Sequence, residues 1–141
     1  EYRNTMDEMG RVSFPSKLRA VLQQNELWVT QGLDHCLMLF TTEEWTKLKE
    51  RVVGSVSVFD KQKREVLRRF IGPAARIEFD KSGRLSIPQS LREYAHLSKD
   101  CVILGINRYM ELWDAESYGK YLSENEDSLK EAAEALSSIS F

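Results

Sequence analysis

The chain has 141 residues, 42% of them hydrophobic and 30% charged, a balance typical of a globular protein with a packed core. No stretch approaches the roughly 20 apolar residues that a membrane-spanning helix needs, so no membrane partner is expected. Its two cysteines, Cys36 and Cys101, are too few for the disulfide framework of a small secreted domain, and we expect reduced, buried thiols.

Charge is unevenly distributed along the chain. The formal net charge is −2, but residues 124–141 hold five acidic residues against one base. That tail carries −4, so residues 1–123 carry +2. Because a DNA-binding protein needs a basic face and not a basic total, the net charge does not exclude nucleic acid as a partner.

An internal repeat is the most informative feature of the sequence. The segment 7–15, DEMGRVSFP, recurs 73 residues later as DKSGRLSIP at 80–88. The same register, without a gap, also relates Leu18 to Leu91, Gly32 to Gly105, Leu39 to Leu112 and Glu43 to Glu116. One register held over this length predicts a duplicated unit, with copies at 1–72 and 73–141 joined around Gly72 and Pro73.

Each copy is expected to begin with a hairpin. Short strands are predicted at 2–6 and 76–79, and return strands at 11–14 and 84–87. Between them, Asp7 and Asp80 can bond the backbone just downstream, while Gly10 and Gly83 supply a positive φ without steric cost. We therefore assign these four residues to shaping the two turns.

Helices and a second hairpin follow in each copy. Pro15 and Pro88 suit the first position of a helix, and apolar residues at 18, 21 and 22, and at 91, 94 and 95, have helical spacing. Strands are predicted at 27–31 and 37–41, and at 101–105 and 109–113, across turns typical of hairpins. Further helices are predicted at 43–52, 60–71, 115–123 and 128–139, which makes the fold class α+β.

Each copy has, in this order, a strand, the motif Asp-x-x-Gly-Arg, a second strand, a proline and a helix. This order resembles the AbrB-type swapped-hairpin DNA-binding fold. Two copies in one chain, each followed by a Gly, a second hairpin and a helix with Trp or Tyr, resemble the MraZ family in particular. The Asp-x-x-x-Arg signature occurs twice, as Asp7 with Arg11 and Asp80 with Arg84. The resemblance covers nearly the whole chain and implies two tandem swapped-hairpin β-barrel units with peripheral helices and a pseudo-two-fold axis.

The resemblance also implies a function. Members of the family are cytoplasmic, nucleoid-associated transcriptional regulators that bind short direct repeats in double-stranded DNA upstream of the division and cell-wall gene cluster, which includes their own gene. They assemble as rings, so this chain is expected to form a ring-like homo-oligomer. The family usually has a few residues before Tyr2, so the first strand is expected to be cut short.

Candidate DNA contacts follow from the same repeat. Arg11 and Arg84 each stand directly after a Gly turn, where a planar guanidinium can pair with guanine or phosphate. The alternative is an ion pair with Asp7 or Asp80 that only holds the turn. Candidate phosphate contacts are Arg3, Lys17 and Lys81. Arg19 and Arg92 occupy equivalent helix positions, and we expect each in a structural ion pair at the repeat or subunit contact.

Other chemistries are not indicated by the sequence. His35 with Cys36, and His96 ahead of Cys101, match no standard zinc spacing, so no metal or other cofactor is expected. The three tryptophans, with Phe40 and Phe70, are expected in the core or an interface. No catalytic constellation stands out, so an enzyme is not expected. The alternatives that stay open are an AbrB-fold antitoxin and an assembly or scaffold protein that does not bind DNA.

Overall fold

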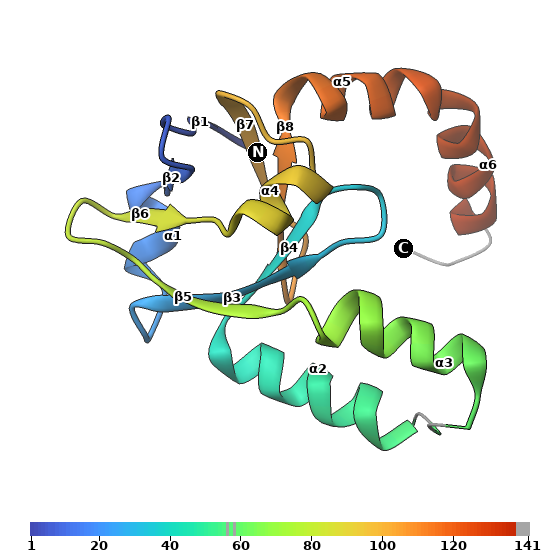
Figure 1. Cartoon of the computed structure of the whole chain (residues 1–141). Helices are drawn as coiled ribbons and strands as arrows, with labels where there is room; N and C mark the ends of the chain where they lie inside the picture. Colours follow the sequence, from blue (N-terminus) through green and yellow to red (C-terminus); the bar gives the residue numbers. More distant parts are fainter. Residues whose placement is uncertain (56, 58, 138–141) are drawn as a thin grey trace.

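The computed structural model describes residues 1–55, 57 and 59–137 of the chain. Eight strands and the helices around them make a mixed α and β fold (Figure 1). In the described part, no helix is both long and apolar enough to cross a bilayer. The elements are β1 (Tyr2–Thr5), β2 (Arg11–Ser13), α1 (Ser16–Ala20), β3 (Glu26–Gln31), β4 (Leu37–Phe40), α2 (Thr42–Ser55), α3 (Lys61–Val66), η1 (Leu67–Ile71), β5 (Ala75–Glu78), β6 (Arg84–Ser86), α4 (Gln89–Tyr94), β7 (Asp100–Gly105), β8 (Met110–Asp114), α5 (Ala115–Glu124) and α6 (Glu126–Ser137).

The two repeats are interleaved in one antiparallel sheet. Its six strands lie in the order β1-β7-β8-β4-β3-β5, and a separate two-stranded ribbon joins β2 to β6. Strand β1 of the first repeat pairs with β7 of the second, and β5 of the second pairs with β3 of the first. Each repeat therefore gives its first strand to its partner repeat, which is the exchange expected of a swapped hairpin.

A pseudo-two-fold axis relates the repeats. In the ribbon, Val12 stands opposite Leu85, and in the sheet Met38 stands opposite Glu111. Both pairs join positions that the 73-residue offset makes equivalent. The predicted fold class and tandem repeat are therefore confirmed. The predicted barrel is not closed, because no hydrogen-bonded ladder joins the edge strands β1 and β5 among the described residues.

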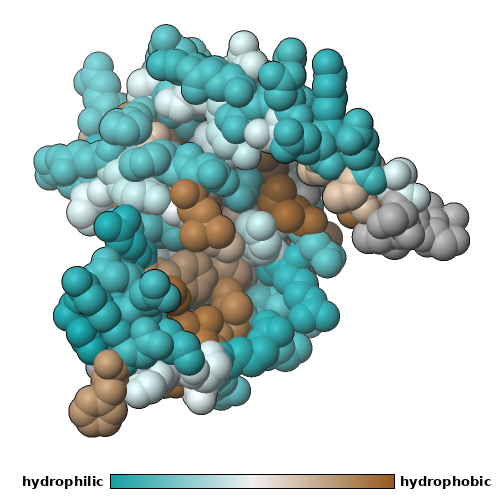
Figure 2. All heavy atoms as spheres, turned by 90° about the vertical axis from the view of Figure 1, so that its right-hand side faces the viewer, coloured by the Kyte–Doolittle hydropathy of each residue, from teal (hydrophilic) through white to brown (hydrophobic). Residues whose placement is uncertain are grey.

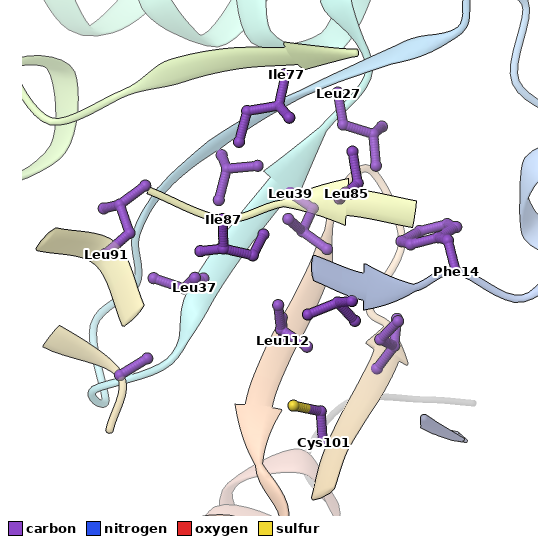
Figure 3. Close-up of a cluster of buried hydrophobic side chains, with 14 of the residues drawn as sticks. Phe14, Leu27, Leu37, Leu39, Ile77, Leu85, Ile87, Leu91, Cys101 and Leu112 are labelled. Carbon is purple, nitrogen blue, oxygen red and sulfur yellow. The ribbon is translucent and has the colours of Figure 1, made fainter. Parts of the chain in front are cut away.

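The main core lies between the ribbon and one face of the six-stranded sheet. Val12 and Leu85 point inward from the ribbon and are each 1% exposed. They join a continuous apolar cluster, which Figure 3 shows between the strands. Its other fully buried aliphatic members are Leu27, Val29, Leu37, Leu39, Leu91, Ala95, Ile103 and Leu112. Burial of these side chains from both repeats fixes the ribbon against the sheet.

The opposite face of the sheet is covered by helices, with α2, α3 and η1 on one half and α5 leading into α6 on the other (Figure 1). Trp28 stacks on Trp45 with ring centroids 5.6 Å apart, and Phe40 and Phe70 complete this cluster. On the other half Trp113 packs between Tyr118 and Tyr121. The prediction that the tryptophans serve packing is confirmed.

Several details differ from the sequence prediction. Pro15 and Pro88 precede their helices as N-caps and are not the first helical residues. Helix α1 ends at Ala20, so Val21, expected in the apolar stripe, is 76% exposed, whereas its counterpart Tyr94 packs against the core. The predicted helix 60–71 changes to π geometry at η1. Helix α6 is described to Ser137, and residues 138–139 of the predicted helix lie outside the described residues.

Candidate nucleic-acid interface

The two-stranded ribbon presents one face to the surface. Since Val12 and Leu85 point into the core, the alternation of a strand turns their neighbours outward. Arg11 stands opposite Ser86, and Ser13 stands opposite Arg84. We call these four residues the ribbon face. The two serines are exposed and the two arginines are half-buried.

The first turn is built around the carboxylate of Asp7. Its Oδ1 accepts backbone N–H bonds from Met9 and Arg11, both at 2.9 Å, and its Oδ2 accepts from Arg11 Nε at 2.6 Å. Gly10 has a φ of +79°, which allows the chain to reverse. The N–H of Arg11 is the largest influence on the Asp7 carboxyl and lowers its pKa.

The second turn repeats this geometry. Asp80 Oδ1 accepts from the backbone N–H groups of Ser82 and Arg84 at 2.9 Å, and its Oδ2 accepts from Arg84 Nε at 2.9 Å. Gly83 has a φ of +75°. The N–H of Arg84 lowers the pKa of Asp80 in the same way. Both turns therefore have the same hydrogen-bond pattern and a glycine with a positive φ.

Within each turn, the aspartate contacts the guanidinium at Nε. Asp7 and Asp80 take the Nε edge, and Arg84 Nη1 also lies 3.6 Å from Asp7 Oδ2, across the ribbon. Exposures of 29% for Arg11 and 31% for Arg84 leave part of each arginine side chain accessible. The ion pair that holds each turn therefore does not exclude a contact between the same arginine and DNA.

The prediction for Arg19 and Arg92 requires correction. Among the described residues, neither guanidinium lies within ion-pair distance of a carboxylate, and both buried Nε atoms lack a hydrogen-bond partner. Instead, Arg92 lies against Gly10 and Arg19 lies against Gly83. Each arginine thus covers the turn of the opposite repeat, and a side chain on either glycine would collide with it. The expected location at the contact between repeats is right, but the expected partner is wrong.

The structure places the remaining candidates in two regions. Lys17 on α1 and Lys81 in the second turn are both exposed on the ribbon side. Arg3 stands opposite Val102 in the β1–β7 pair and so lies on the helix-covered face of the sheet, near Tyr118, while its neighbour Tyr2 packs against the core. The fold therefore brings Lys17 and Lys81 to the ribbon side but does not bring Arg3 there.

The cysteines and histidines do not form a metal-binding group in the described part of the chain. Cys36 and Cys101 are buried free thiols, and burial raises their pKa to about 12 and about 11. The ring of His35 stacks on Tyr94 and on His96, with centroids 5.0 Å and 5.8 Å apart. These residues therefore contribute packing between the repeats.

Comparisons with known proteins agree with the internal repeat. The family described as "MraZ protein, putative antitoxin-like" matches residues 1–69 and again 70–138. A protein of Treponema denticola named "Transcriptional regulator MraZ" is 51% identical over 141 residues, covering 100% of this chain and 98% of that protein. Proteins of the same name from Halothermothrix orenii and Treponema pallidum are 41% and 39% identical, covering 99% and 98% of this chain and 96% and 93% of theirs. The chain belongs to the MraZ family.

Proposed function

We propose that this protein is a transcriptional regulator that binds double-stranded DNA through the ribbon face. The observation that carries the proposal is the pair of arginines, Arg11 and Arg84, held on one exposed face by equivalent Asp-Gly turns. A major groove about 12 Å wide admits a two-stranded ribbon, and a guanidinium can pair with guanine O6 and N7 there. The relatives named as transcriptional regulators support this reading.

The size of the ribbon supports binding by several subunits. Gly10 and Phe14 are four residues apart, so the turns are separated by about 13 Å along the ribbon. That length corresponds to about four base pairs at 3.4 Å each. One subunit therefore covers too little DNA for a specific site. A ring-like homo-oligomer that places several ribbon faces on short direct repeats gains affinity through multivalency.

The targets and location that we propose follow from the family resemblance. The protein is a cytoplasmic, nucleoid-associated regulator of the division and cell-wall gene cluster, and it binds upstream of its own gene. An AbrB-fold antitoxin would usually carry one DNA-binding copy and a disordered toxin-binding tail. Here both copies carry the Asp-Arg turn, and residues 126–137 form a helix, which favours the regulator.

A binding assay on the DNA upstream of the protein's own gene tests this function. Wild-type protein should bind that fragment more tightly than unrelated DNA of equal length. Arg11→Ala and Arg84→Ala should each weaken specific binding by about 1–3 kcal/mol per lost bidentate contact, and relax base preference. Arg76→Ala is the matched control, because Arg76 is an exposed arginine on β5 that pairs with Glu26 and Glu78 and lies on the other face of the sheet.

Folding must be checked in the same experiment. Because Arg11 and Arg84 also hold their turns, each variant should be compared by circular dichroism and thermal unfolding. Arg11→Lys keeps the charge but removes the planar fork, so it should lose selectivity while keeping most nonspecific affinity. If folded Arg11→Ala/Arg84→Ala protein keeps full affinity and selectivity for the fragment, the ribbon face is not the DNA-binding surface.

A further inference from the structure

We propose that the two ends of the ribbon are chemically unequal, and that one end holds the DNA phosphates and so gives each subunit a fixed polarity on the duplex. This inference rests on the proposed DNA-binding function. It concerns residues at which the two repeats differ, whereas the Asp-Arg pairs are the same in both. The inequality is present in the sequence, but the swapped fold is needed to see which residues share an end.

Each end combines a turn from one repeat with a helix from the other. At the first end, the N–H of Ile87 donates to Gly10 O at 3.0 Å, and α4 follows directly, with Arg92 over Gly10. At the second end, the N–H of Phe14 donates to Gly83 O at 3.1 Å, and α1 follows, with Arg19 over Gly83. We define the first end as residues 7–11 with 89–94, and the second end as 80–84 with 16–21.

The two ends carry opposite charge. The first end has two cations, Arg11 and Arg92, and three anions, Asp7, Glu8 and Glu93, so its net charge is −1. The second end has four cations, Lys17, Arg19, Lys81 and Arg84, and one anion, Asp80, so its net charge is +3. The whole difference arises at three pairs of equivalent positions: Glu8 and Lys81, Lys17 and Ser90, and Ala20 and Glu93.

These differing side chains are available to solvent and to DNA. Glu8, Lys17, Lys81 and Glu93 are all exposed. Lys17 and Lys81 have no ion-pair partner among the described residues, and Glu93 accepts only a hydrogen bond from Gln89. Because each phosphate neutralised by a lysine releases counterions, the second end should dominate the electrostatic part of binding. The carboxylates of the first end oppose close approach of phosphate.

Unequal ends would also allow a pseudo-symmetric ribbon to bind DNA in one orientation. A ribbon with a true two-fold axis would read two inverted half-sites equally and would have no preferred direction on the duplex. Direct repeats, by contrast, all point the same way, so subunits that bind them in one orientation must distinguish their two ends. The charges at positions 8, 17, 81 and 93 provide that distinction without changing the Asp-Arg pair at either turn.

Salt dependence tests which end contacts phosphate. Binding of full-length protein to the upstream fragment should be measured from low to high salt for Lys81→Ala and Lys17→Ala, with Glu8→Ala and Ser90→Ala as their equivalents at the first end. Each lysine variant should lower the slope of log K against log salt by about 0.9 per contacting subunit and weaken binding about fivefold at 0.15 M salt. Glu8→Ala and Ser90→Ala should leave the slope unchanged.

Directed cleavage tests the polarity. Met9 and Ser82 are equivalent and exposed, whereas Cys36 and Cys101 are buried, so Met9→Cys and Ser82→Cys each offer one accessible thiol for an iron chelate that cuts DNA. The two conjugates should cut at opposite sides of each repeat. The double variant Glu8→Lys/Lys81→Glu keeps the net charge. In this protein, the difference between the two cleavage patterns should become smaller or reverse.

The outcomes separate the inference from the proposed function. Variants at the two ends could lower the slope of log K against log salt equally, or the two conjugates could give identical cleavage patterns. Either result would overturn the polarity and leave DNA binding intact. Failure of the wild-type protein to bind the upstream fragment at any salt concentration would overturn the proposed function and the polarity together. The polarity is supported if only the variants of the second end lower the salt slope and the two conjugates cut at separate sites.

Discussion

The guanidinium of Arg92 lies over Gly10, although the two residues belong to different repeats. Arg19 and Gly83 make the equivalent contact at the other end of the ribbon. Each turn is thus formed by its own Asp and Gly but covered by a helix of the opposite repeat. The geometry of both Asp-Arg pairs therefore depends on docking between the repeats, and either repeat alone would leave its turn uncovered.

Replacement of Gly10 by alanine should destabilise the protein. The φ of +79° costs a residue with a side chain about 1–2 kcal/mol, and the new Cβ would also overlap the Arg92 guanidinium, which must then move. We expect the free energy of unfolding to fall by about 1–3 kcal/mol, measured by urea denaturation. Gly83→Ala should behave in the same way.

Gly119→Ala is the matched control for these variants. Gly119 lies within α5, where a Cβ would meet nothing within 4 Å, so alanine should stabilise the helix by about 0.5–1 kcal/mol. A double-mutant cycle of Gly10→Ala with Arg92→Ala separates the overlap from the φ cost, because removal of Arg92 relieves only the overlap. Gly10→Ala protein as stable as wild type would contradict the contact described for Arg92.

Asp7→Asn should change DNA selectivity more than Asp80→Asn. The Asp7 carboxylate holds Arg11 Nε at 2.6 Å and lies 3.6 Å from Arg84 Nη1, whereas the Asp80 carboxylate pairs with Arg84 alone. Asparagine keeps the shape but removes a negative charge, so nonspecific affinity should rise while both arginines lose orientation. We expect a lower ratio of specific to nonspecific affinity, measured by competition binding. Equal ratios for the two variants would show that the contact across the ribbon has no effect.

Asp114 should make a pH-dependent contribution to stability. Burial opposes its ionisation, but hydrogen bonds from Ser98 and Ser117 outweigh this effect and lower the pKa of Asp114 below its ordinary 3.8. Since the folded-state pKa is depressed, the stabilisation is present at neutral pH and is lost as the pH falls below 3.8 through the folded-state value. Asp114→Ala should cost about 1–2 kcal/mol at pH 7, and this difference should shrink in acid.

Thr41 provides the matched control for Asp114. It occupies the equivalent position of the first repeat, where its hydroxyl accepts from the backbone N–H of Glu44 at 3.2 Å. Thr41→Ala should cost about 1 kcal/mol at any pH, because a hydroxyl does not titrate in this range. The check is urea denaturation of both variants at neutral and acidic pH. Parallel pH profiles for the two would show that the Asp114 charge contributes nothing.

The repeat and the turns could be predicted from the sequence because their causes are local. Asp7 bonds groups two and four residues away, and the same pattern 73 residues later made the duplication visible. The exchange of first strands came from the family resemblance, since no local pattern specifies which copy β1 joins. Helical spacing alone predicts Val21 in the apolar stripe of a helix, but α1 ends one residue before it.

Contacts between the repeats could not be predicted from spacing. Arg19 and Gly83 are far apart in the sequence and meet only because the first strands are exchanged. An arginine at a repeat contact suggests an ion pair, yet here each guanidinium lies against a glycine of the other repeat. Arg3 lies on the helix-covered face of the sheet because side chains alternate along a strand. Tyr2 packs against the core, so Arg3 points to the opposite face.

The spacing of DNA repeats should matter more than any single base if several subunits bind together. One ribbon face covers about four base pairs, so each subunit alone should bind weakly. Subunits along one side of the duplex should prefer repeats about one helical turn, ~10 base pairs, apart. Insertion of about half a turn should lower affinity more than a single-base change, measured by gel shift. Indifference to the insertion would argue against multivalent binding.

The surface outside the ribbon offers a contact for the ring-like assembly that we propose. Helix α6 buries none of its residues, and Leu129 and Leu136 are 68% and 47% exposed. On the side of the molecule next to α3 and α6, apolar side chains gather in a depression between polar layers (Figure 2). The helices also differ in charge. The 60–71 segment has five basic and two acidic residues, and the described α6 has four acidic residues and one base.

Truncation after Ser123 should therefore weaken the assembly. We expect the acidic α6 of one subunit to lie near the basic 60–71 segment of the next, which would set a head-to-tail direction and allow a ring to close. Exposed ion pairs contribute little each, so the contact should respond to salt, while the apolar residues of α6 supply the remaining attraction. Light scattering after size exclusion should give a smaller mass for the truncated protein than for the full chain. Leu129→Ser/Leu136→Ser, which keeps every charge, should give a partial loss. Truncated protein that keeps its full oligomer mass at both low and high salt would exclude α6 from the contact.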